Sequence, residues 1–442
     1  MISSGFGMGV PRRCRQNIAC RGVPVIPRYA LIYSGRDAAG RRQHGREAAR
    51  RRAMTPWYQA EDAQGRDGTH ALVIGVSDYR YLPAAFDEAP PDGAGETLGL
   101  TSVTTPAVSA WRFANWLAGE SGLNRPEAPL ASVRLLLSPS QAEVDATPAL
   151  GGLDAATVPL PTRDNVLDAL YAWRDACNAR PGNLGVLYVA GHGIQLSKDD
   201  SLVLLHDFGR AHRPILDAAM DLGSIWRGMA GPDAAQLQYY FVDACRTKPG
   251  LFDDYLSTRA GVAFDVTDEG GVESAPIFYS ASPRTLALGL PADGTLFCQA
   301  LLRCLDGEAA ELDANGRWVV STSSLVRHLP AAVDRLAAEH QARQSAVVGG
   351  LLRDGVFHYL PEPPEVDLGI HISPKAAAAR ARCRLADFSG RQVYDRRPVP
   401  PEIDLRVKAG LYALQLEVEN DGPPVLRPFL AAPPRHREEI AL

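Results

Sequence analysis

Two residues in the sequence have the chemical types and the setting that nucleophilic catalysis requires. His192 lies in the sequence GHG directly after one apolar run, and Cys245 lies in DACR directly after another. A thiolate attacks carbonyl carbon, and a nearby imidazole either lowers the pKa of the thiol or takes its proton during the attack. The two residues therefore predict a cysteine nucleophile with a histidine base.

The glycines on both sides of His192 favour the same chemistry. Glycine lets the main chain turn sharply and lets a substrate approach without obstruction by a Cβ atom. The tetrahedral intermediate of acyl transfer needs N–H donors aimed at its negative oxygen. We predict the main-chain N–H groups of Gly193 and Cys245 as these donors.

Each residue alone has a more ordinary interpretation. Most histidines are hydrogen-bonded in structural roles, and most lone cysteines are inert buried thiols. Catalysis is favoured here because His192 and Cys245 both follow apolar runs and are separated by 53 residues, enough for one crossover between neighbouring strands. The other nearby imidazoles, His206 and His212, are interpreted as surface residues or as contacts at the rim of the site.

Apolar runs alternating with amphipathic stretches predict the elements that position this pair. Strands separated by helices and buried on both faces indicate a mainly parallel sheet between two helical layers. In such a sheet the residues after the carboxyl ends of neighbouring strands meet at one edge, so His192 and Cys245 should meet there. The predicted strands cover residues 71–76, 133–137, 185–190, 237–242 and 277–280, and the predicted helices lie around residues 107–117, 166–177, 222–229, 296–305 and 325–336.

The motifs YVAGHG and FVDACR resemble the caspase, metacaspase and bacterial caspase-like group of cysteine peptidases. Three further segments resemble the same group: ALVIGVSDYRYLP as its opening strand and loop, APIFYSAS as the strand after the cysteine, and DGTLFCQALLRCLDG as the helix and turn that follow. The resemblance covers roughly residues 70–360. It implies a caspase-like three-layer α/β sandwich around a mostly parallel six-stranded sheet, protein or peptide substrates, and no redox or nucleotide cofactor.

The cysteine motif departs from the QACRG of animal caspases and is closer to the metacaspase and bacterial form. In metacaspase-like relatives the matching acid lines the pocket for the residue before the scissile bond. The resemblance therefore implies that Asp243 favours Arg or Lys there, with Asp78, Ser280 and Ser282 as further candidates for the pocket. The carboxylate of Asp243 could equally cap the turn that follows it.

The long connection from Arg246 to Ala275 is rich in acidic residues. In relatives of this group, processing or ordering of this region activates the enzyme, so cleavage at Lys248 or Arg259 is a hypothesis, as is an activating protein partner. Calcium binding, known among metacaspases, is conceivable, but no EF-hand spacing supports it, and no other metal site is predicted. The acidic residues are Asp253, Asp254, Asp265, Asp268, Glu269 and Glu273.

Charge divides the chain into a basic leader and an acidic body. Residues 1–53 hold twelve arginines against Asp37 and Glu47, a net charge of +10. The whole chain has a net charge of −5, so the remaining residues carry −15. The leader shows no helical or strand period and is expected to be disordered. It lacks the apolar stretch of a secretory signal, so it is either an organelle transit peptide or a mis-assigned start before Met54.

Composition excludes several function classes. The acidic body does not indicate nucleic-acid binding, and no apolar run of about 18 residues predicts a membrane helix. Seven cysteines without CxxC pairs disfavour a disulfide framework or a zinc site and favour a reducing, cytoplasmic location. We predict a basic disordered leader (1–68), a caspase-like peptidase domain (69–360) and a small β-sandwich-like accessory domain (361–442).

The accessory domain begins at PEPP, where the pattern becomes strand-like. Its clearest predicted piece is a hairpin over residues 403–418 with a turn at 408–410. It holds no catalytic constellation, so binding, docking and stabilisation stay open as its roles.

The favoured function is a cysteine endopeptidase, with a stress or defence role by analogy with standalone bacterial relatives. The alternative from another class is a catalytically inactive caspase-fold scaffold for protein interaction. A flavodoxin-like binding module is weaker, because ALVIGVSDY offers only Gly75 and no Gly-rich phosphate loop.

Overall fold

The computed structural model describes residues 55–63, 65–86, 88–195, 201–231, 234–246, 264, 272–281, 289–290, 293–419 and 423–441. Within these ranges no helix has both the length and the apolar character needed to cross a membrane.

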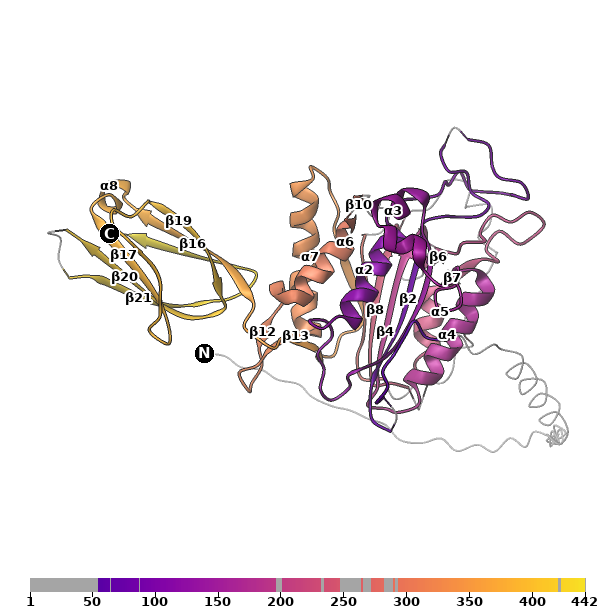
Figure 1. Ribbon diagram of the computed structural model, residues 1–442, viewed down its shortest axis with the longest axis horizontal. Helices are drawn as coiled ribbons and strands as arrows, with labels where there is room; N and C mark the ends of the chain where they lie inside the picture. The colour runs from indigo at the N-terminus through magenta and orange to yellow at the C-terminus, as the bar shows by residue number, and fades with distance from the viewer. Residues whose placement is uncertain are drawn as a thin grey trace, which may run out of the picture. The chain divides into compact units, whose positions relative to one another are not determined.

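A seven-stranded sheet forms the centre of the α/β domain (Figure 1). The five inner strands run parallel and the two edge strands run antiparallel to their neighbours. Almost every residue of the inner strands is buried, because both faces of the sheet are covered. In sheet order the strands are β1 (Tyr58–Gln59), β3 (Leu130–Ser138), β2 (Thr69–Val76), β4 (Leu184–Gly191), β8 (Leu237–Ala244), β9 (Ala275–Tyr279) and β14 (Val347–Leu351).

Helices cover the sheet in two layers, each with its own apolar core (Figure 1). One layer holds α2 (Pro106–Ala118), α6 (Leu296–Arg303) and α7 (Thr322–Glu339), and the other holds α4 (Arg163–Cys177) and α5 (Leu222–Gly228). Phe113 of α2 stacks on Tyr188 of β4 in the first core, while Trp173 of α4 packs on the opposite face. The predicted three-layer sandwich around a mostly parallel sheet is confirmed.

The smaller elements of this domain surround the sheet. They are α3 (Gln141–Ala146), the 3-10 turn Pro148–Gly152, β5 (Gly193–Gln195), β6 (Ser201–Leu204), β7 (Ala219–Asp221), β10 (Gly289–Leu290), β11 (Gly294–Thr295), the π-helical turn Cys304–Glu308, β12 (Glu311–Leu312), β13 (Trp318–Ser321) and β15 (Val356–Tyr359).

The predicted leader boundary at residue 68 is wrong for its last part. Tyr58 and Gln59 form β1, which pairs with β3. The sheet therefore has seven strands rather than the six predicted, and neither β1 nor β14 is among the strand segments predicted by residue range. Trp57 packs edge-to-face on Trp111 of α2, with ring centroids 5.6 Å apart. The two apolar rings bury each other, which draws this segment onto the fold although it carries no strand period. Residues 1–53, predicted to be disordered, lie outside the described residues.

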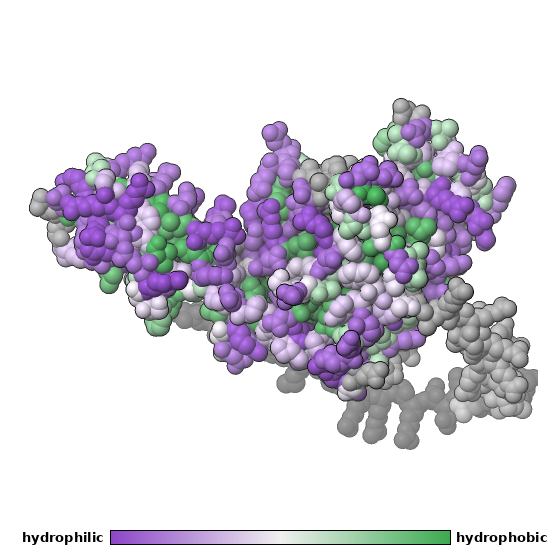
Figure 2. Space-filling model, viewed as in Figure 1, coloured by the Kyte–Doolittle hydropathy of each residue, from purple (hydrophilic) through white to green (hydrophobic). Residues whose placement is uncertain are grey.

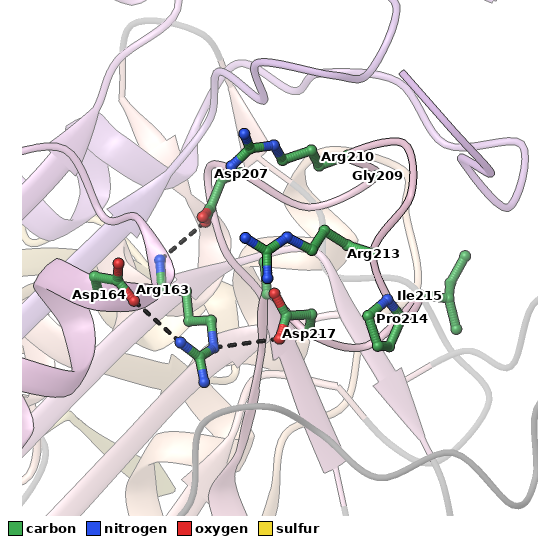
Figure 3. Close-up of a pocket in the computed structure, with 10 residues that line it drawn as sticks. Arg163, Asp164, Asp207, Gly209, Arg210, Arg213, Pro214, Ile215 and Asp217 are labelled. Atoms are coloured by element: carbon green, nitrogen blue, oxygen red, sulfur yellow. Dashed lines mark hydrogen bonds and ion pairs between the residues drawn. The ribbon is translucent and has the colours of Figure 1, made fainter. Parts of the chain in front are cut away.

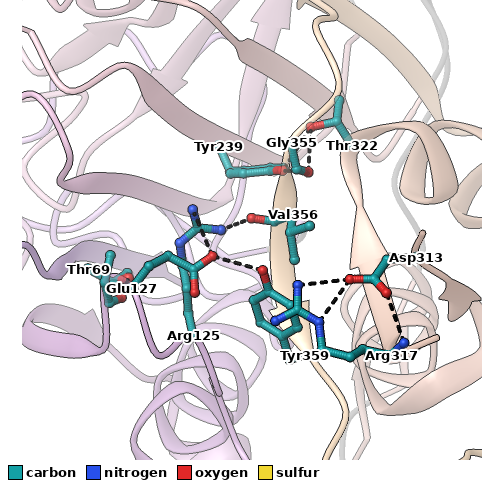
Figure 4. A network of polar contacts seen from close by, with 11 residues as sticks. Thr69, Arg125, Glu127, Tyr239, Asp313, Arg317, Thr322, Gly355, Val356 and Tyr359 are labelled. Carbon is teal, nitrogen blue, oxygen red and sulfur yellow. Dashed lines mark hydrogen bonds and ion pairs between the residues drawn. The ribbon is translucent and has the colours of Figure 1, made fainter. Parts of the chain in front are cut away.

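A polar network fastens the end of the sheet where the parallel strands begin (Figure 4). Arg125 donates to the Val356 carbonyl of β15, and Glu127 accepts from the Tyr359 hydroxyl at 3.0 Å. Arg317 lies over the Tyr359 ring, 4.5 Å from its centroid. These contacts join the segment before β3 to β15 at the end of the sheet opposite the carboxyl ends of the inner strands.

The C-terminal region forms a second body of structure built only from two sheets and one short helix. Alternating residues of its strands point into a separate apolar core that includes Ile370, Cys383 and Leu414. Hydrophilic residues dominate its visible face in Figure 2. One sheet holds β19 (Glu402–Lys408), β16 (Glu365–Ser373) and β22 (Arg435–Ala441); the other holds β18 (Gln392–Arg396), β17 (Ala381–Asp387), β20 (Gly410–Val418) and β21 (Val425–Ala431), and the helix is α8 (Lys375–Ala378).

The predicted hairpin over residues 403–418 is wrong. Its two strands exist as β19 and β20, but β19 pairs with β16 in one sheet and β20 pairs with β17 and β21 in the other. The chain crosses from sheet to sheet at Ala409, so Val407 and Leu414, which lie in different sheets, belong to the same core. A hairpin and this arch have the same alternation of buried and exposed residues along their strands. The sequence pattern therefore could not distinguish the two structures.

Candidate active site

The two predicted catalytic residues leave neighbouring strands at the same level of the sheet. Gly191 of β4 pairs with Ala244 of β8 as the last rung of their parallel ladder. His192 and Cys245 are the next residue of each strand, and adjacent strands lie about 4.8 Å apart. The sheet register thus brings residues His192 and Cys245 to one edge of the sheet.

The main chain after His192 touches the main chain of Cys245. A Cβ atom at Gly193 would lie 2.1 Å from the Cys245 carbonyl oxygen and 2.9 Å from the Ala244 Cβ, so only glycine fits. Gly193 pairs with Val203 of β6, and the Leu204 N–H donates to the His192 carbonyl at 2.9 Å. In an antiparallel ladder this pattern turns the Gly193 N–H away from β6. That N–H is therefore not used by the β5–β6 ladder.

One hydrogen bond fixes the proton on the His192 ring. Its Nε2 lies 2.6 Å from the Thr101 carbonyl oxygen, and because a carbonyl only accepts, Nε2 carries the hydrogen. In the neutral ring Nδ1 is then a proton acceptor. Burial lowers the pKa of His192, although the bond to Thr101 opposes the shift, so the neutral form is favoured near pH 7. A neutral imidazole with Nδ1 unprotonated has the state that a general base needs.

Tyr79 and Thr101 hold the histidine, and sequence reasoning did not single out either. The Tyr79 hydroxyl accepts the main-chain N–H of His192 at 2.8 Å, and the two rings pack with centroids 5.1 Å apart. Thr101 contributes only its carbonyl, which carries no side-chain signal. The signal for Tyr79 was its place in the ALVIGVSDYRYLP segment after β2. The Val103 N–H donates to the Ser77 carbonyl at 2.9 Å and thereby fastens the Thr101 loop to the end of β2.

Asp243, predicted to line the substrate pocket, is buried with 1% of its surface exposed. Its Oδ2 accepts hydrogen bonds from the Tyr188 hydroxyl of β4 (2.7 Å) and from the Thr295 hydroxyl at the start of α6. Burial raises the pKa of Asp243 to about 6, against the effect of these hydroxyl donors. The carboxylate is therefore held by β4 and α6, and the alternative role of capping the turn after it gains no support from these contacts.

The other predicted pocket residues fall in three different places. Ser280 is buried beside Asp243, and its hydroxyl donates to the Ala244 carbonyl at 3.2 Å. Asp78 is 52% exposed, with Oδ2 3.8 Å from Nδ1 of His206. Ser282 lies outside the described residues.

Of the two additional histidines, His206 is buried rather than a surface residue. Its Nδ1 donates to the Asp78 main-chain carbonyl at 2.8 Å, so it supports the loop after β2. His212 is exposed, as expected. The interpretation of His206 as a contact at the rim of the site stays a prediction, and its observed contact is with the loop after β2.

The loop that carries His206 is fastened by a cluster of charges at the start of α4. Figure 3 shows Arg163 between Asp164 and Asp217, with its main-chain N–H directed at the Asp207 carboxylate. The cavity there is small, about 90 Å³, and is also lined by Arg210 and Arg213. Acidic and basic side chains alternate around this cavity and pair with one another. The cluster therefore holds the loop in place on α4.

A larger hollow of about 440 Å³ begins at the residue after Cys245. The Arg246 guanidinium lies over the Tyr279 ring, 4.2 Å from its centroid, and both line the hollow. Trp226 of α5 and the main chain of β14 complete its walls. Sequence reasoning assigned nothing to Arg246.

The acidic connection, for which processing is a hypothesis and calcium binding only conceivable, lies almost wholly outside the described residues. Across the ranges that the structure does describe, no group of three or more His, Cys, Asp and Glu side chains could hold a metal ion. Lys248 and Arg259 are also outside these ranges.

Comparison with family models identifies the family of this chain. The family model of the caspase domain matches residues 114–347, which include His192 and Cys245 and more than half of the chain. Among solved structures, caspase-1 from Spodoptera frugiperda is similar with 12% identity and a TM-score of 0.36, over 70% of this chain and 98% of that one. No curated protein matches. On the extent of the family match, the chain belongs to the caspase domain family, a family of cysteine peptidases.

Proposed function

We propose that the protein is a cysteine endopeptidase in which Cys245 is the nucleophile and His192 the general base and acid. The observation that carries the proposal is the pairing of Gly191 with Ala244. Because of this pairing, His192 and Cys245 each follow directly after the ends of two adjacent strands. The hydrogen bond from His192 Nε2 to Thr101 adds to it, because it leaves Nδ1 as the proton acceptor.

The proposed reaction runs through a thioester. His192 Nδ1 takes the thiol proton while Sγ of Cys245 bonds to the peptide carbonyl carbon, and the Gly193 and Cys245 N–H groups donate to the resulting oxyanion. His192 then gives this proton to the leaving amine as the C–N bond breaks. In the second half, His192 takes a proton from water as the hydroxide bonds to the thioester carbon, the C–S bond breaks to release the new carboxyl group, and the proton returns to the sulfur.

The proposed substrate carries Arg or Lys before the scissile bond. Asp243 lies two residues before Cys245, and residues two apart on a strand project from the same face, about 7 Å apart. A buried carboxylate without a cation is costly, so a basic substrate side chain would stabilise its charged form. Ser280, whose hydroxyl donates to the Ala244 carbonyl, is proposed as part of the same pocket wall.

The setting of the activity is also a proposal. A thiol nucleophile suits a reducing, cytoplasmic compartment. By resemblance to bacterial caspase-like proteins, we propose a regulated stress or defence role, released by processing near Lys248 or Arg259 or by a protein partner. A purified protein that is fully active as a single chain without a partner would contradict that regulation.

Labelling with a thiol-reactive peptide tests the chemistry. Peptidyl chloromethyl ketones ending in Arg, Lys or Asp are incubated with the protein, and the modified residue is located by mass spectrometry. We expect labelling of Cys245 by the Arg and Lys reagents, and a loss of about 10²-fold or more in His192→Ala. His371→Ala, a partly exposed histidine of the C-terminal sandwich, is the matched control and should label normally.

Two results would contradict the proposal. Labelling that favours another cysteine shows that Cys245 is no activated nucleophile. Equal labelling of wild type and His192→Ala shows that the imidazole does not act on the thiol, which is the behaviour of the inactive scaffold.

A further inference from the structure

The two oxygens of the Asp243 carboxylate have different surroundings. Oδ2 accepts one hydrogen from the Tyr188 hydroxyl and one from the Thr295 hydroxyl. Oδ1 is buried and accepts no hydrogen bond from any residue in the described ranges. Ser280 is adjacent: its hydroxyl donates to the Ala244 carbonyl at 3.2 Å and lies close enough to the carboxylate to lower the pKa of Asp243. A carboxylate oxygen has two lone pairs, so Oδ2 is saturated, whereas Oδ1 has only the Ser280 hydroxyl nearby and can still accept a hydrogen bond.

Both donors are themselves fixed. Thr295 precedes α6 and accepts the Cys298 N–H at 3.1 Å, while its own N–H donates to the Ser109 hydroxyl of α2 at 2.8 Å. Tyr188 is fully buried in β4 and stacks on Phe113, with centroids 4.8 Å apart. The two hydroxyls therefore cannot leave Oδ2 without disturbing packed elements, and the carboxylate keeps one orientation.

We propose that Tyr188 and Thr295 are positioning residues for substrate selection, which saturate Oδ2 of Asp243 and leave Oδ1 as the single acceptor for a basic substrate side chain. The inference rests on the proposed function, because it concerns the same pocket. An Arg guanidinium gains most from a carboxylate by bonding both oxygens in parallel. With Oδ2 saturated this fork cannot form, whereas a Lys ammonium needs only one acceptor.

The chemical class of the substrate follows from this geometry. The pocket takes a Lys side chain as readily as an Arg side chain, and a cation that bonds through one N–H is sufficient. Tyr188 and Cys298 are the titratable groups that contact or face Asp243 from the described elements, and both stay protonated near pH 8 because burial raises their pKa values, that of Cys298 to about 12. At pH 8 Asp243 is ionised, since its pKa is about 6.

The test is the ratio of kcat/KM for two peptides that differ only in Arg or Lys before the scissile bond, measured at pH 8. In wild type we expect a ratio within about threefold of one. Tyr188→Phe frees one lone pair of Oδ2 and should raise the Arg-to-Lys ratio by about three- to tenfold, the worth of one charge-assisted hydrogen bond. Thr295→Val should act in the same direction.

Two variants control for effects on the fold. Tyr239→Phe makes the same change in a buried tyrosine of β8, whose hydroxyl contacts Thr322 and Gly355 rather than Asp243, and should keep the wild-type ratio. Thr295→Ser keeps the hydroxyl and should restore the wild-type ratio even where Thr295→Val has lost part of its helix cap.

The outcomes separate the two claims. Cleavage with an unchanged ratio in Tyr188→Phe and Thr295→Val overturns the positioning role and leaves the peptidase intact. A wild-type ratio far above threefold in favour of Arg also overturns it. Absence of cleavage of both peptides together with absence of Cys245 labelling removes the proposed function, and this inference with it.

Discussion

At the scale of single residues, the geometry of the site depends strongly on main-chain atoms. The Thr101 carbonyl sets the tautomer of His192, and the Tyr79 hydroxyl holds the histidine N–H. Gly193 has no side chain, and this absence lets its main chain lie against Cys245. The side chains that would react are thus oriented by groups that a sequence pattern does not display.

Gly193→Ala should lower kcat strongly, and overpacking against the Cys245 main chain should also cost about 1–3 kcal/mol in the free energy of unfolding. A Cβ atom at this position would lie 2.1 Å from the Cys245 carbonyl oxygen, so the nucleophile and the proposed oxyanion donors must move. Loss of one such donor lowers kcat by about 10²- to 10³-fold. The measurement is kcat for a Lys peptide, with circular dichroism to verify folding. Gly349→Ala of β14, whose nearest neighbour would be Tyr279 at 3.8 Å, should stay near wild type.

A Gly193→Ala enzyme with kcat within about threefold of wild type would show that the close approach has no part in catalysis.

The preference for a basic side chain should disappear in acid. As pH falls through about 6, Asp243 takes up a proton and no longer attracts an ammonium group. Comparing kcat/KM for a Lys peptide with that for a Gln peptide isolates Asp243, because His192 and Cys245 act on both. The Lys-to-Gln ratio should be constant above about pH 7 and fall below about pH 6. In Asp243→Asn it should be low at every pH.

If the Lys-to-Gln ratio of kcat/KM in wild type stays constant from pH 5 to pH 8, Asp243 does not select the substrate side chain.

At the scale of elements, the close packing of α2 on β2 sets the carboxyl edge of the sheet. Gly75 of β2 faces α2, and a Cβ atom there would lie 2.7 Å from the Ala110 Cβ and 2.8 Å from the Ala107 Cα. Buried Ser109 of the same helix supports Thr295. The position of α2 therefore affects both the packing of the sheet and the surroundings of Asp243.

Gly75→Ala should destabilise the fold, because backbone atoms of α2 cannot rotate out of the way as a flexible side chain does. Overpacking of this kind costs about 1–3 kcal/mol in the free energy of unfolding, measured by urea denaturation. Gly152→Ala, where no atom lies within 4 Å of the added Cβ, is the matched control and should be close to neutral. Equal unfolding midpoints for the two variants would contradict the packing argument.

The inner strands and their helices were predictable because each carries a strong apolar pattern. Continuous runs such as ALVIGV and GVLYVA predicted β2 and β4, and the order of parallel strands then predicted the meeting of His192 and Cys245. β1 was not predicted, because a strand of two residues is too short to show a strand period. The arch between β19 and β20 was not predicted, because the alternation of apolar residues shows which face of a strand is buried but does not show which sheet the strand joins. Asp243 was found, but its partners Tyr188 and Thr295 come together only in the fold.

At the scale of the whole molecule, the described residues contain separate apolar cores. Two cores lie on the faces of the seven-stranded sheet, and a third fills the C-terminal sandwich. His192, Cys245 and Asp243 all belong to the first body. The chemistry proposed for the site therefore draws on no side chain of the sandwich.

Leu414→Ala should weaken the sandwich and leave catalysis unchanged. Leu414 is fully buried in the third core, where such a truncation costs about 2–5 kcal/mol. We expect a lower-temperature transition in calorimetry and an unchanged kcat/KM below that temperature. Leu411→Ala of the same strand, 51% exposed, should change neither. A loss of kcat/KM in Leu414→Ala while the sandwich is still folded would show that the C-terminal sheets support the site.

The ladder around β8 has a consequence for a nicked molecule. β8 is bonded to β4 on one side and to β9 on the other, while residues 245–274 join β8 to β9 along the chain. If a protease severed that stretch, the imidazole and the thiol would remain on the same fragment, and the second fragment would stay attached as the next strand over. The two fragments would then elute together in size-exclusion chromatography and would separate only in denaturant.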